Sequence, residues 1–303
     1  MPIKIKDSLP AQSILEEENI FVLTENTAIH QDIRPLNVLI LNLMSNKIET
    51  ETQLLRMLSN SPLQINVELL TTETYKSARN AAHLESFYTT FSKIKDRRFD
   101  GMIITGAPLP YVEFENVTFW DEVCMIMDWA ETHVHSMFNL CWGAFAAYYN
   151  YYGILRRFYT DKKKLSGIYR HTILTPRDPL FRGFDDHFYA PHSREWYIDK
   201  DEILHNPKLV IMAESLKAGP AIVKTKDNRK LFVLSHGEYD YNTLQEEYIR
   251  DSAKDPETPV PENYFPDDDP GKKPENYWRS AAQLLYTNWL NYYVYQSVPY
   301  DFT

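Results

Sequence analysis

The feature that most constrains this chain is an alternation of strand-like and helix-like patterns between residues 36 and 140. Strand-like segments occupy 36–43, 65–69, 101–104 and 135–140, of which 36–43 is an apolar run and 65–69 alternates apolar and polar residues. Helix-like segments occupy the intervals 47–60, 83–95 and 120–131. Strands separated by helices are joined by right-handed crossovers, which make the strands parallel. The pattern predicts an α/β fold with a doubly wound, mainly parallel sheet flanked by helices.

The second half is less regular. Strands are expected around 165–170, 208–213, 220–224 and 230–235, with a hairpin at Asp227-Asn228 and a helix over 241–254. Residues 255–274 are rich in Pro and Asp, which predicts an irregular surface excursion. A last helix follows, with helically spaced apolar residues at Trp278, Ala281, Ala282, Leu285, Trp289 and Tyr292. We expect residues 1–303 to form a single domain.

Charge narrows the choice of partners. The chain has 42 acidic and 32 basic residues, a formal charge of −10, which repels phosphate backbones and anionic membranes. No run of about 18 apolar residues could span a bilayer, and the start MPIKIKDSLPAQ lacks the apolar core of a signal peptide. We therefore expect a cytoplasmic protein with no nucleic-acid or membrane partner.

The chain has two cysteines, Cys124 and Cys141, too few for a disulfide framework or a four-thiolate metal site. Cys141 lies in FNLCWGA, at the end of a predicted strand and before a helix-compatible run. Taken alone, such a Cys is more often a core residue, and Cys124 fits that description in mid-helix. A helix N-terminus or a nearby His would instead favour a reactive thiolate, and the N–H of Trp142 would then face a developing oxyanion.

His236-Gly237-Glu238 comes after another predicted strand, 230–235. In extended backbone His236 and Glu238 would point the same way, so the carboxylate could hold the imidazole in the tautomer that takes a proton from Cys141. The triplet alone is a weak signal. A Cys at one strand end and His-x-Glu at a later one together favour a nucleophilic site.

Metal binding is the alternative for the other histidines. His133 and His135 are read as alternating on a strand edge, where they could form a metal pair, but no third ligand is evident nearby. His192, in PHSR, is expected in a polar loop, either structural or part of a pocket wall. We expect no metal site.

The chain resembles the homoserine O-acyltransferases, and the similarity covers nearly its whole length. The matching segments are MPIKIKDSLPA, IRPLNVLILNLMSNKIETETQLLRMLSNSPLQI, FDGMIITGAP, CWGA, KLSGIY, RGFDD, PHSR, HGEYD, NYFPDDDP and NWLNYYVYQSVPYD. The resemblance implies the class I glutamine amidotransferase-like, flavodoxin-like fold with a Cys-His-Glu triad. Cys141 would accept the acyl group, His236 the proton, and Glu238 would orient His236.

The resemblance also implies substrate contacts at Lys164 of KLSG, Ser193 of PHSR and Arg250 of EEYIRD. These types suit an amino acid, since Lys and Arg bind carboxylates and Ser hydrogen-bonds polar groups. Without the family, Lys164 and Arg250 would be read as solvated charges. Ala107 of TGAP would supply a second oxyanion N–H, because Pro108 has none.

Some positions depart from the family pattern. Pro110 stands where acetyl-using members usually have Glu and succinyl-using members Gly, which removes the usual cue to the acyl donor. Phe145 replaces a common Gln, Ser45 a common Pro, and Ser235-His236-Gly237 the more frequent Gly-His-Pro. These changes leave the triad residues in place.

The leading hypothesis is a ping-pong acyltransferase that uses acyl-CoA as co-substrate, with no bound cofactor. Acetyl is favoured, because Pro110 offers neither the extra room of Gly nor a positive charge for a succinyl carboxylate. L-homoserine is the first acceptor and L-serine the second, since one methylene changes binding by only about 1–3 kcal/mol.

Succinyl transfer, an amidotransferase-like hydrolase and a non-catalytic binding protein are the remaining alternatives. The aromatic stretch Trp289 to Tyr295 could also serve a homodimer contact.

Overall fold

The structure is a computed structural model that describes residues 3–17, 22–24, 35–74, 80–109, 111–159 and 164–299. Within these residues one mixed sheet of 12 strands forms the centre, in the order β10-β9-β12-β13-β14-β7-β6-β3-β4-β1-β2, with β5 paired to β4. Its strands are β1 Ile3–Ile5, β2 Val22–Thr24, β3 Leu36–Leu41, β4 Ile65–Leu70, β5 Tyr88–Thr89, β6 Phe99–Ile104, β7 Val134–Leu140, β9 Leu165–Ile173, β10 His187–Arg194, β12 Leu209–Ser215, β13 Gly219–Thr225 and β14 Lys230–Val233. A separate two-stranded sheet pairs β8 (Arg156–Phe158) with β11 (Trp196–Ile198).

The half of the sheet from β14 to β2 is parallel and doubly wound. After β3 the chain adds β4 on one side and later returns to add β6 on the other, so the strand order reverses at β3. The carboxyl ends of β3, β6, β7 and β14 therefore meet at one edge, where α/β folds place their sites. The α/β fold class expected from the sequence is confirmed.

The other half of the sheet, from β14 to β10, is antiparallel. The predicted hairpin joins β13 and β14, and Asn228 takes the positive φ (63°) that its tight turn requires. The two halves join where β14 pairs in parallel with β7.

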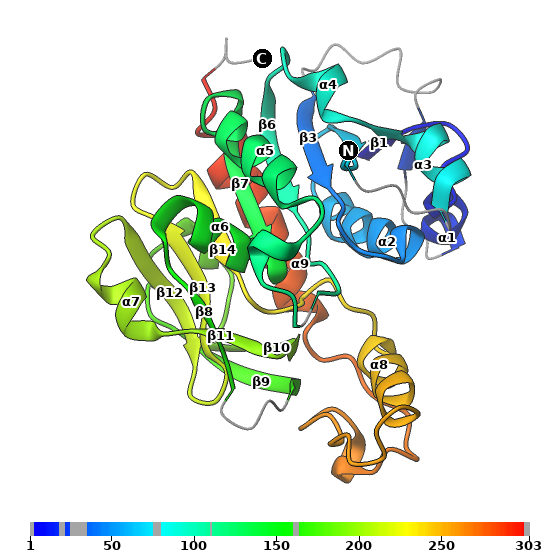
Figure 1. The fold of residues 1–303 in the computed structure, drawn as a ribbon, viewed down its shortest axis with the longest axis vertical. Helices are drawn as coiled ribbons and strands as arrows, with labels where there is room; N and C mark the ends of the chain where they lie inside the picture. The colour runs from blue at the N-terminus through cyan, green and yellow to red at the C-terminus, as the bar shows by residue number, and fades with distance from the viewer. Residues whose placement is uncertain are drawn as a thin grey trace.

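Helices cover both faces of the parallel half, and Figure 1 shows α5 and α6 in front of the strands with α9 behind them. They are α1 Ala11–Glu17, α2 Lys47–Ser59, α3 Ala81–Phe87, α4 Phe91–Ile94, α5 Trp120–His133, α6 Trp142–Tyr152, α7 Lys200–His205, α8 Thr243–Ser252 and α9 Arg279–Asn288. Alternate residues of each strand enter opposite cores: Val38 and Phe138 face α2 and α9, whereas Leu39 and Met137 face α5 and α6.

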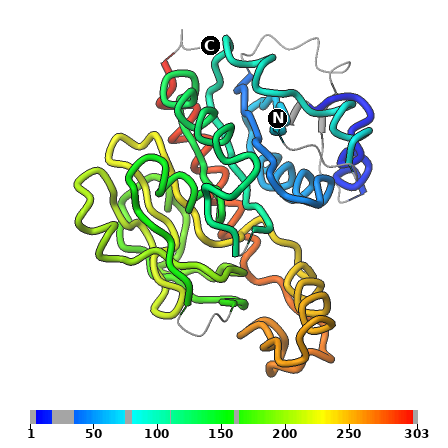
Figure 2. Tube along the Cα trace, in the orientation of Figure 1, coloured from blue at the N-terminus to red at the C-terminus, as the bar shows by residue number. Residues whose placement is uncertain are grey.

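The C-terminal segment closes the face opposite α5 and α6. After α9 the chain continues as a π-helix, Trp289–Tyr295, and Figure 2 traces this red segment behind the green strands. Trp289 and Val294 are completely buried, whereas Tyr295 is exposed. The homodimer contact expected for this stretch stays a prediction. Among the helices the structure describes, none is long and apolar enough to cross a membrane.

Two expectations about elements are wrong. The helix expected over 83–95 is broken into α3 and α4, because Tyr88 and Thr89 form β5 and pair with β4. His192 lies in β10 and not in a polar loop, and it is completely buried. A proline followed by three consecutive polar residues, Pro191-His192-Ser193-Arg194, concealed this strand.

The segment after α8 is irregular, with a 3₁₀ turn at Pro266–Asp268, and Figure 1 shows it at one end of the molecule together with α8. Two aromatic residues anchor it, since Tyr264 and Phe265 are buried against Ile168 of β9 and Trp278. The excursion therefore holds α8 beside the ends of β9 and β10. The division into a single domain stays a prediction.

Candidate active site

Cys141 occupies the turn between β7 and α6 in a conformation that side chains rarely adopt, with φ 50° and ψ −111°. Its N–H donates to Val233 O (2.8 Å), and its carbonyl accepts the first bonds of α6, from Ala144 N (2.9 Å) and Phe145 N (3.1 Å). The residue is partly exposed. Such a turn presents the thiol at the sheet edge and next to the free N–H groups that begin a helix.

Two glycines lie against this turn, and one of them is required by a close contact. A Cβ on Gly143 would lie 2.7 Å from the Ile104 carbonyl oxygen, so α6 begins in close contact with the end of β6. A Cβ on Gly106 would lie 3.6 Å from Cys141 Cβ and 4.0 Å from His236 Cε1. Gly106, Cys141 and His236 therefore surround one small space.

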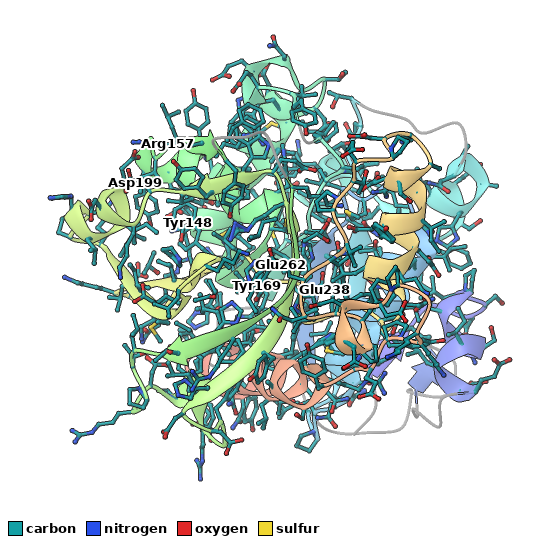
Figure 3. The ribbon with its side chains drawn as sticks, turned by 90° about the horizontal axis from the view of Figure 1, so that it is seen from below. Tyr148, Arg157, Tyr169, Asp199, Glu238 and Glu262 are labelled. Carbon is teal, nitrogen blue, oxygen red and sulfur yellow. The ribbon has the colours of Figure 1, made fainter. Side chains whose placement is uncertain are left out.

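His236 and Glu238 meet after the end of β14. The Nδ1 of His236 lies 2.7 Å from Glu238 Oε1, and both side chains are buried. The sequence argument assumed extended backbone, but the residues lie in a turn, in which Tyr239 N donates to His236 O (3.2 Å). Figure 3 labels Glu238 near the ends of the green strands and beside α8.

The environment of His236 favours its protonated form. Burial by itself lowers the pKa of His236, but Cys141 and the Glu238 carboxylate outweigh it and raise the pKa well above its ordinary value. The backbone is fixed as well, since His236 N donates to Pro191 O of β10 (2.8 Å). The arrangement can support a proton transfer between a thiol and an imidazole.

A second cluster centres on Glu247 of α8, a residue that the sequence argument missed. Lys164 Nζ donates to Glu247 Oε2 (2.8 Å), the Ser193 hydroxyl donates to the same oxygen, and the Tyr239 hydroxyl donates to Oε1 (3.0 Å). Burial raises the pKa of Glu247, but the Lys164 ammonium and these hydrogen bonds outweigh it, so the net pKa is lowered. Glu247 is ionised at neutral pH.

Arg250 lies at the outer side of this cluster and is mostly exposed. Its guanidinium binds both carboxylate oxygens of Asp251, at 2.8 and 3.1 Å, and Asp251 also accepts from Lys164 (3.1 Å). Glu247, Arg250 and Asp251 are spaced i, i+3 and i+4, which places them on one face of α8. That spacing in EEYIRD was the signal that could have identified Glu247.

The predicted oxyanion donors are the residues that follow Cys141 and Gly106 in the chain. Trp142 is the first residue of α6, whose opening N–H groups have no acceptor within the helix, and Ala107 is partly exposed in the loop after β6. Their roles stay predictions. Pro110 lies outside the described residues. Phe145 lies in the first turn of α6, where its N–H donates to Cys141 O (3.1 Å), and its side chain is buried in the core on that face of the sheet.

A cavity of about 360 Å³ opens at the ends of β3, β4 and β6, and the sequence argument did not anticipate it. Its lining includes Met44, Lys47, Leu109 and Val112. Lys47, in the first turn of α2, is buried, and burial lowers its pKa to about 8. Met44 links the cavity to Cys141, because its sulfur lies 3.6 Å from the same Gly106 Cβ position.

His133 and His135, expected to alternate on one strand edge, lie in different elements. His133 ends α5 and stacks on Trp129, whereas His135 lies in β7 and bonds Ser297 Oγ (2.9 Å). Within the described ranges no group of three or more His, Cys, Asp or Glu could hold a metal ion. His192 pairs with His171 through their Nε2 atoms (2.9 Å), and burial lowers the pKa of both.

A family model described as homoserine O-succinyltransferase matches residues 2–300. The chain belongs to the homoserine O-succinyltransferase family. Curated relatives named homoserine O-acetyltransferase include those of Acetivibrio thermocellus (52% identical, covering 99% of this chain and 98% of the relative), Lachnoclostridium phytofermentans (53%, 99% and 100%) and Methanomassiliicoccus intestinalis (52%, 99% and 98%). The resemblance inferred from the motifs is confirmed.

Two solved structures share the fold of this protein. A glutamine amidotransferase from Thermotoga maritima matches with a TM-score of 0.56 and 12% identity, over 87% of this chain and 100% of its own. The structure titled SMU.1228c matches with a TM-score of 0.57 and 17% identity, over 84% and 97%. At these identities the likeness concerns the fold alone, and it confirms the class I glutamine amidotransferase-like architecture.

Proposed function

We propose that the protein transfers an acetyl group from acetyl-CoA to the side-chain hydroxyl of L-homoserine through an acyl-thioester on Cys141. The observation that carries the proposal is the position of Cys141, on a strained turn beside an imidazole that Glu238 holds. End-to-end similarity to proteins named homoserine O-acetyltransferase supports both the donor and the acceptor.

In the first half-reaction the Cys141 thiolate attacks the thioester carbonyl of acetyl-CoA. The oxyanion is stabilised by the N–H groups of Trp142 and Ala107, and collapse forms the Cys141 thioester while the C–S bond to CoA breaks. His236, protonated by transfer from Cys141, donates this proton to the departing CoA thiolate. Its raised pKa supports this role, because the imidazolium is stable beside the Cys141 thiolate and Glu238.

In the second half-reaction the homoserine hydroxyl gives its proton to His236 as its oxygen attacks the Cys141 thioester. The new ester forms and the bond to sulfur breaks, which leaves the Cys141 thiolate beside the protonated His236, the pair that began the first half-reaction. Cys141 and His236 thus return to their starting protonation states.

The Glu247 cluster supplies groups for a zwitterionic acceptor. An amino acid needs a cation for its carboxylate and an anion for its ammonium, and Lys164, Arg250 and Glu247 provide both charges. Ser193, bonded to Glu247, adds a hydroxyl for hydrogen bonding. The cavity lined by Met44 and Leu109 is the site we propose for the acyl donor, because Met44 also lies near Gly106 beside Cys141.

The test separates donor, acceptor and reaction class. The protein is incubated with acetyl-CoA or succinyl-CoA alone, and peptide mass spectrometry locates the adduct. Acetyl on Cys141 is expected, and homoserine should then stimulate CoA release more strongly than serine. Cys141→Ala should abolish the adduct. Cys124→Ser is the matched control and should retain it, because burial raises the Cys124 pKa to about 11.

An adduct on Cys124, or no acceptor that accelerates CoA release, would overturn the proposal. Ammonia release from glutamine without CoA would instead identify an amidotransferase-like hydrolase. Preferential succinyl transfer would correct the donor, and faster transfer to serine would correct the acceptor.

We also propose that the enzyme acts in the cytoplasm.

A further inference from the structure

Tyr239 contacts both clusters of the candidate site. Its ring stacks on the His236 imidazole, with ring centroids 4.2 Å apart and planes 21° from parallel. Its hydroxyl donates to Glu247 Oε1 (3.0 Å). The Tyr239 side chain therefore connects the His236 imidazole, which transfers the proton, to the Glu247 carboxylate, which is assigned to binding the acceptor.

Tyr239 is firmly held. The side chain is buried, and the backbone N–H donates to His236 O (3.2 Å). The backbone carbonyl accepts from Trp278 Nε1 (3.1 Å), and Trp278 is itself buried in the cluster that anchors the excursion. A ring fixed at both backbone groups limits how far the imidazole against it can tilt.

The hydroxyl has a separate partner. Lys164 and Ser193 donate to Glu247 Oε2, whereas the Tyr239 hydroxyl donates to the other carboxylate oxygen, Oε1. Without this donor the partly buried Oε1 would lose a hydrogen bond, and the carboxylate could rotate. The hydroxyl therefore fixes the orientation of Glu247.

We propose that Tyr239 is a positioning residue with two separable functions. The ring sets the plane of His236 for proton exchange with Cys141, and the hydroxyl sets Glu247 for the ammonium of the acceptor. The second function rests on the proposed acyltransferase reaction. The first does not, because it concerns only the pairing of Cys141 and His236.

The test compares Tyr239→Phe, which keeps the ring, with Tyr239→Leu, which removes it, in a Cys124→Ser background. Tyr293→Phe is the matched control, because Tyr293 also donates its hydroxyl to a carboxylate, Asp178 Oδ1 (2.6 Å), outside the candidate site. Iodoacetamide alkylation of Cys141 across pH reports on the Cys141–His236 pair without any substrate. Steady-state kinetics then separate KM for homoserine from kcat.

Tyr239→Phe should leave the alkylation profile within about twofold of the parent and raise the homoserine KM by about tenfold or more, as expected for loss of a hydrogen bond to a charged group. Tyr239→Leu should slow alkylation by about tenfold and change its pH profile, because a mobile imidazole pairs less well with the thiolate. Tyr293→Phe should change neither readout. If Tyr239→Leu does not fold, Tyr239→Met also removes the flat ring and fills the site with a longer, more adaptable side chain.

Equal slowing of alkylation in the Phe and Leu variants would overturn the separation of ring and hydroxyl. An unchanged homoserine KM in Tyr239→Phe would overturn the function assigned to the hydroxyl. If the parent protein alkylates normally but transfers no acyl group, the proposed reaction is wrong, and the alkylation comparison still decides the function of the ring.

Discussion

At the scale of single residues, the candidate site depends on a backbone conformation that Cys141 adopts at a cost of about 1–3 kcal/mol. Three backbone hydrogen bonds hold the turn, one to Val233 of β14 and two to the first turn of α6. The conformation therefore follows from the pairing of β7 with β14 and the start of α6. Cys141 is therefore both the candidate nucleophile and part of the contact between β7, β14 and α6.

Two glycines near Cys141 should respond differently to alanine. Gly143→Ala places a Cβ 2.7 Å from a backbone oxygen that cannot move freely, so we expect a loss of about 1–3 kcal/mol of unfolding free energy. Gly106→Ala places a Cβ at ordinary contact distances of 3.6 Å or more, so stability should be kept. Its methyl would occupy the space beside Cys141, and acylation by acetyl-CoA should slow. Urea unfolding and adduct formation measure the two effects, and equal destabilisation by both variants would contradict the assignment.

The raised pKa of His236 predicts a pH-dependent contribution to stability. A group whose pKa is raised on folding stabilises the fold fully below its unfolded pKa of about 6.5, and this contribution is lost as pH rises through the folded value. Glu238→Gln should lower the His236 pKa, so the variant should be less stable than the parent near pH 6. The difference should shrink at alkaline pH. Its turnover should fall by about 10²–10⁴-fold.

Urea unfolding of Glu238→Gln and the parent at several pH values checks this sign. A difference that grows with rising pH would show that Glu238 does not stabilise the imidazolium.

At the scale of elements, β10 and α8 show the limits of prediction from the sequence: β10 was missed, and α8 was expected without its orientation. β10 was missed because Pro191, His192 and Arg194 resemble a loop. In the structure the two terminal nitrogens of Arg194 donate to Tyr159 OH and to two carbonyl groups. Helix α8 was expected, but the sequence does not reveal which of its faces meets β10. Glu247 was therefore missed, although its neighbour Arg250 was named from the family pattern.

Cys141, His236 and Glu238 could be brought together from the sequence because parallel strands end at one edge of a sheet. The first half of the chain displays the order of strands and helices clearly, which places Cys141, whereas His236 and Glu238 were placed only by the strand expected before them and by the family pattern. The link from His236 through Tyr239 to Glu247 could not be predicted, since it depends on how an irregular segment packs. The buried Trp278 that fixes this segment lies 39 positions from Tyr239.

At the scale of the whole molecule, the site straddles the junction of the parallel and antiparallel halves. Cys141 follows β7 on the parallel side, His236 follows β14 at the junction, and Ser193 comes from β10 on the antiparallel side. A shift between the halves would separate the nucleophile from the acceptor groups. The elements that cover the junction therefore matter for function without contacting substrate.

The C-terminal π-helix is one such element, and it supports the last prediction. Trp289 is completely buried, donates Nε1 to Ser136 Oγ of β7 (3.0 Å) and lies 3.1 Å from the Cβ position of Gly101 in β6. Trp289→Ala should lower the unfolding free energy by about 3–5 kcal/mol through the cavity it leaves. Tyr295→Ala, which removes an exposed ring in the same segment, should change it by less than about 0.5 kcal/mol.

Denaturant unfolding measures both variants, and the fraction of Cys141 that accepts acetyl measures the intact site. Because Trp289 lies away from the candidate site residues, the folded Trp289→Ala molecules should acylate at the parent rate, and activity should fall only as the folded fraction falls. Slower acylation in fully folded Trp289→Ala would mean that β7 has shifted. The C-terminal segment would then position the nucleophile as well as stabilise the sheet.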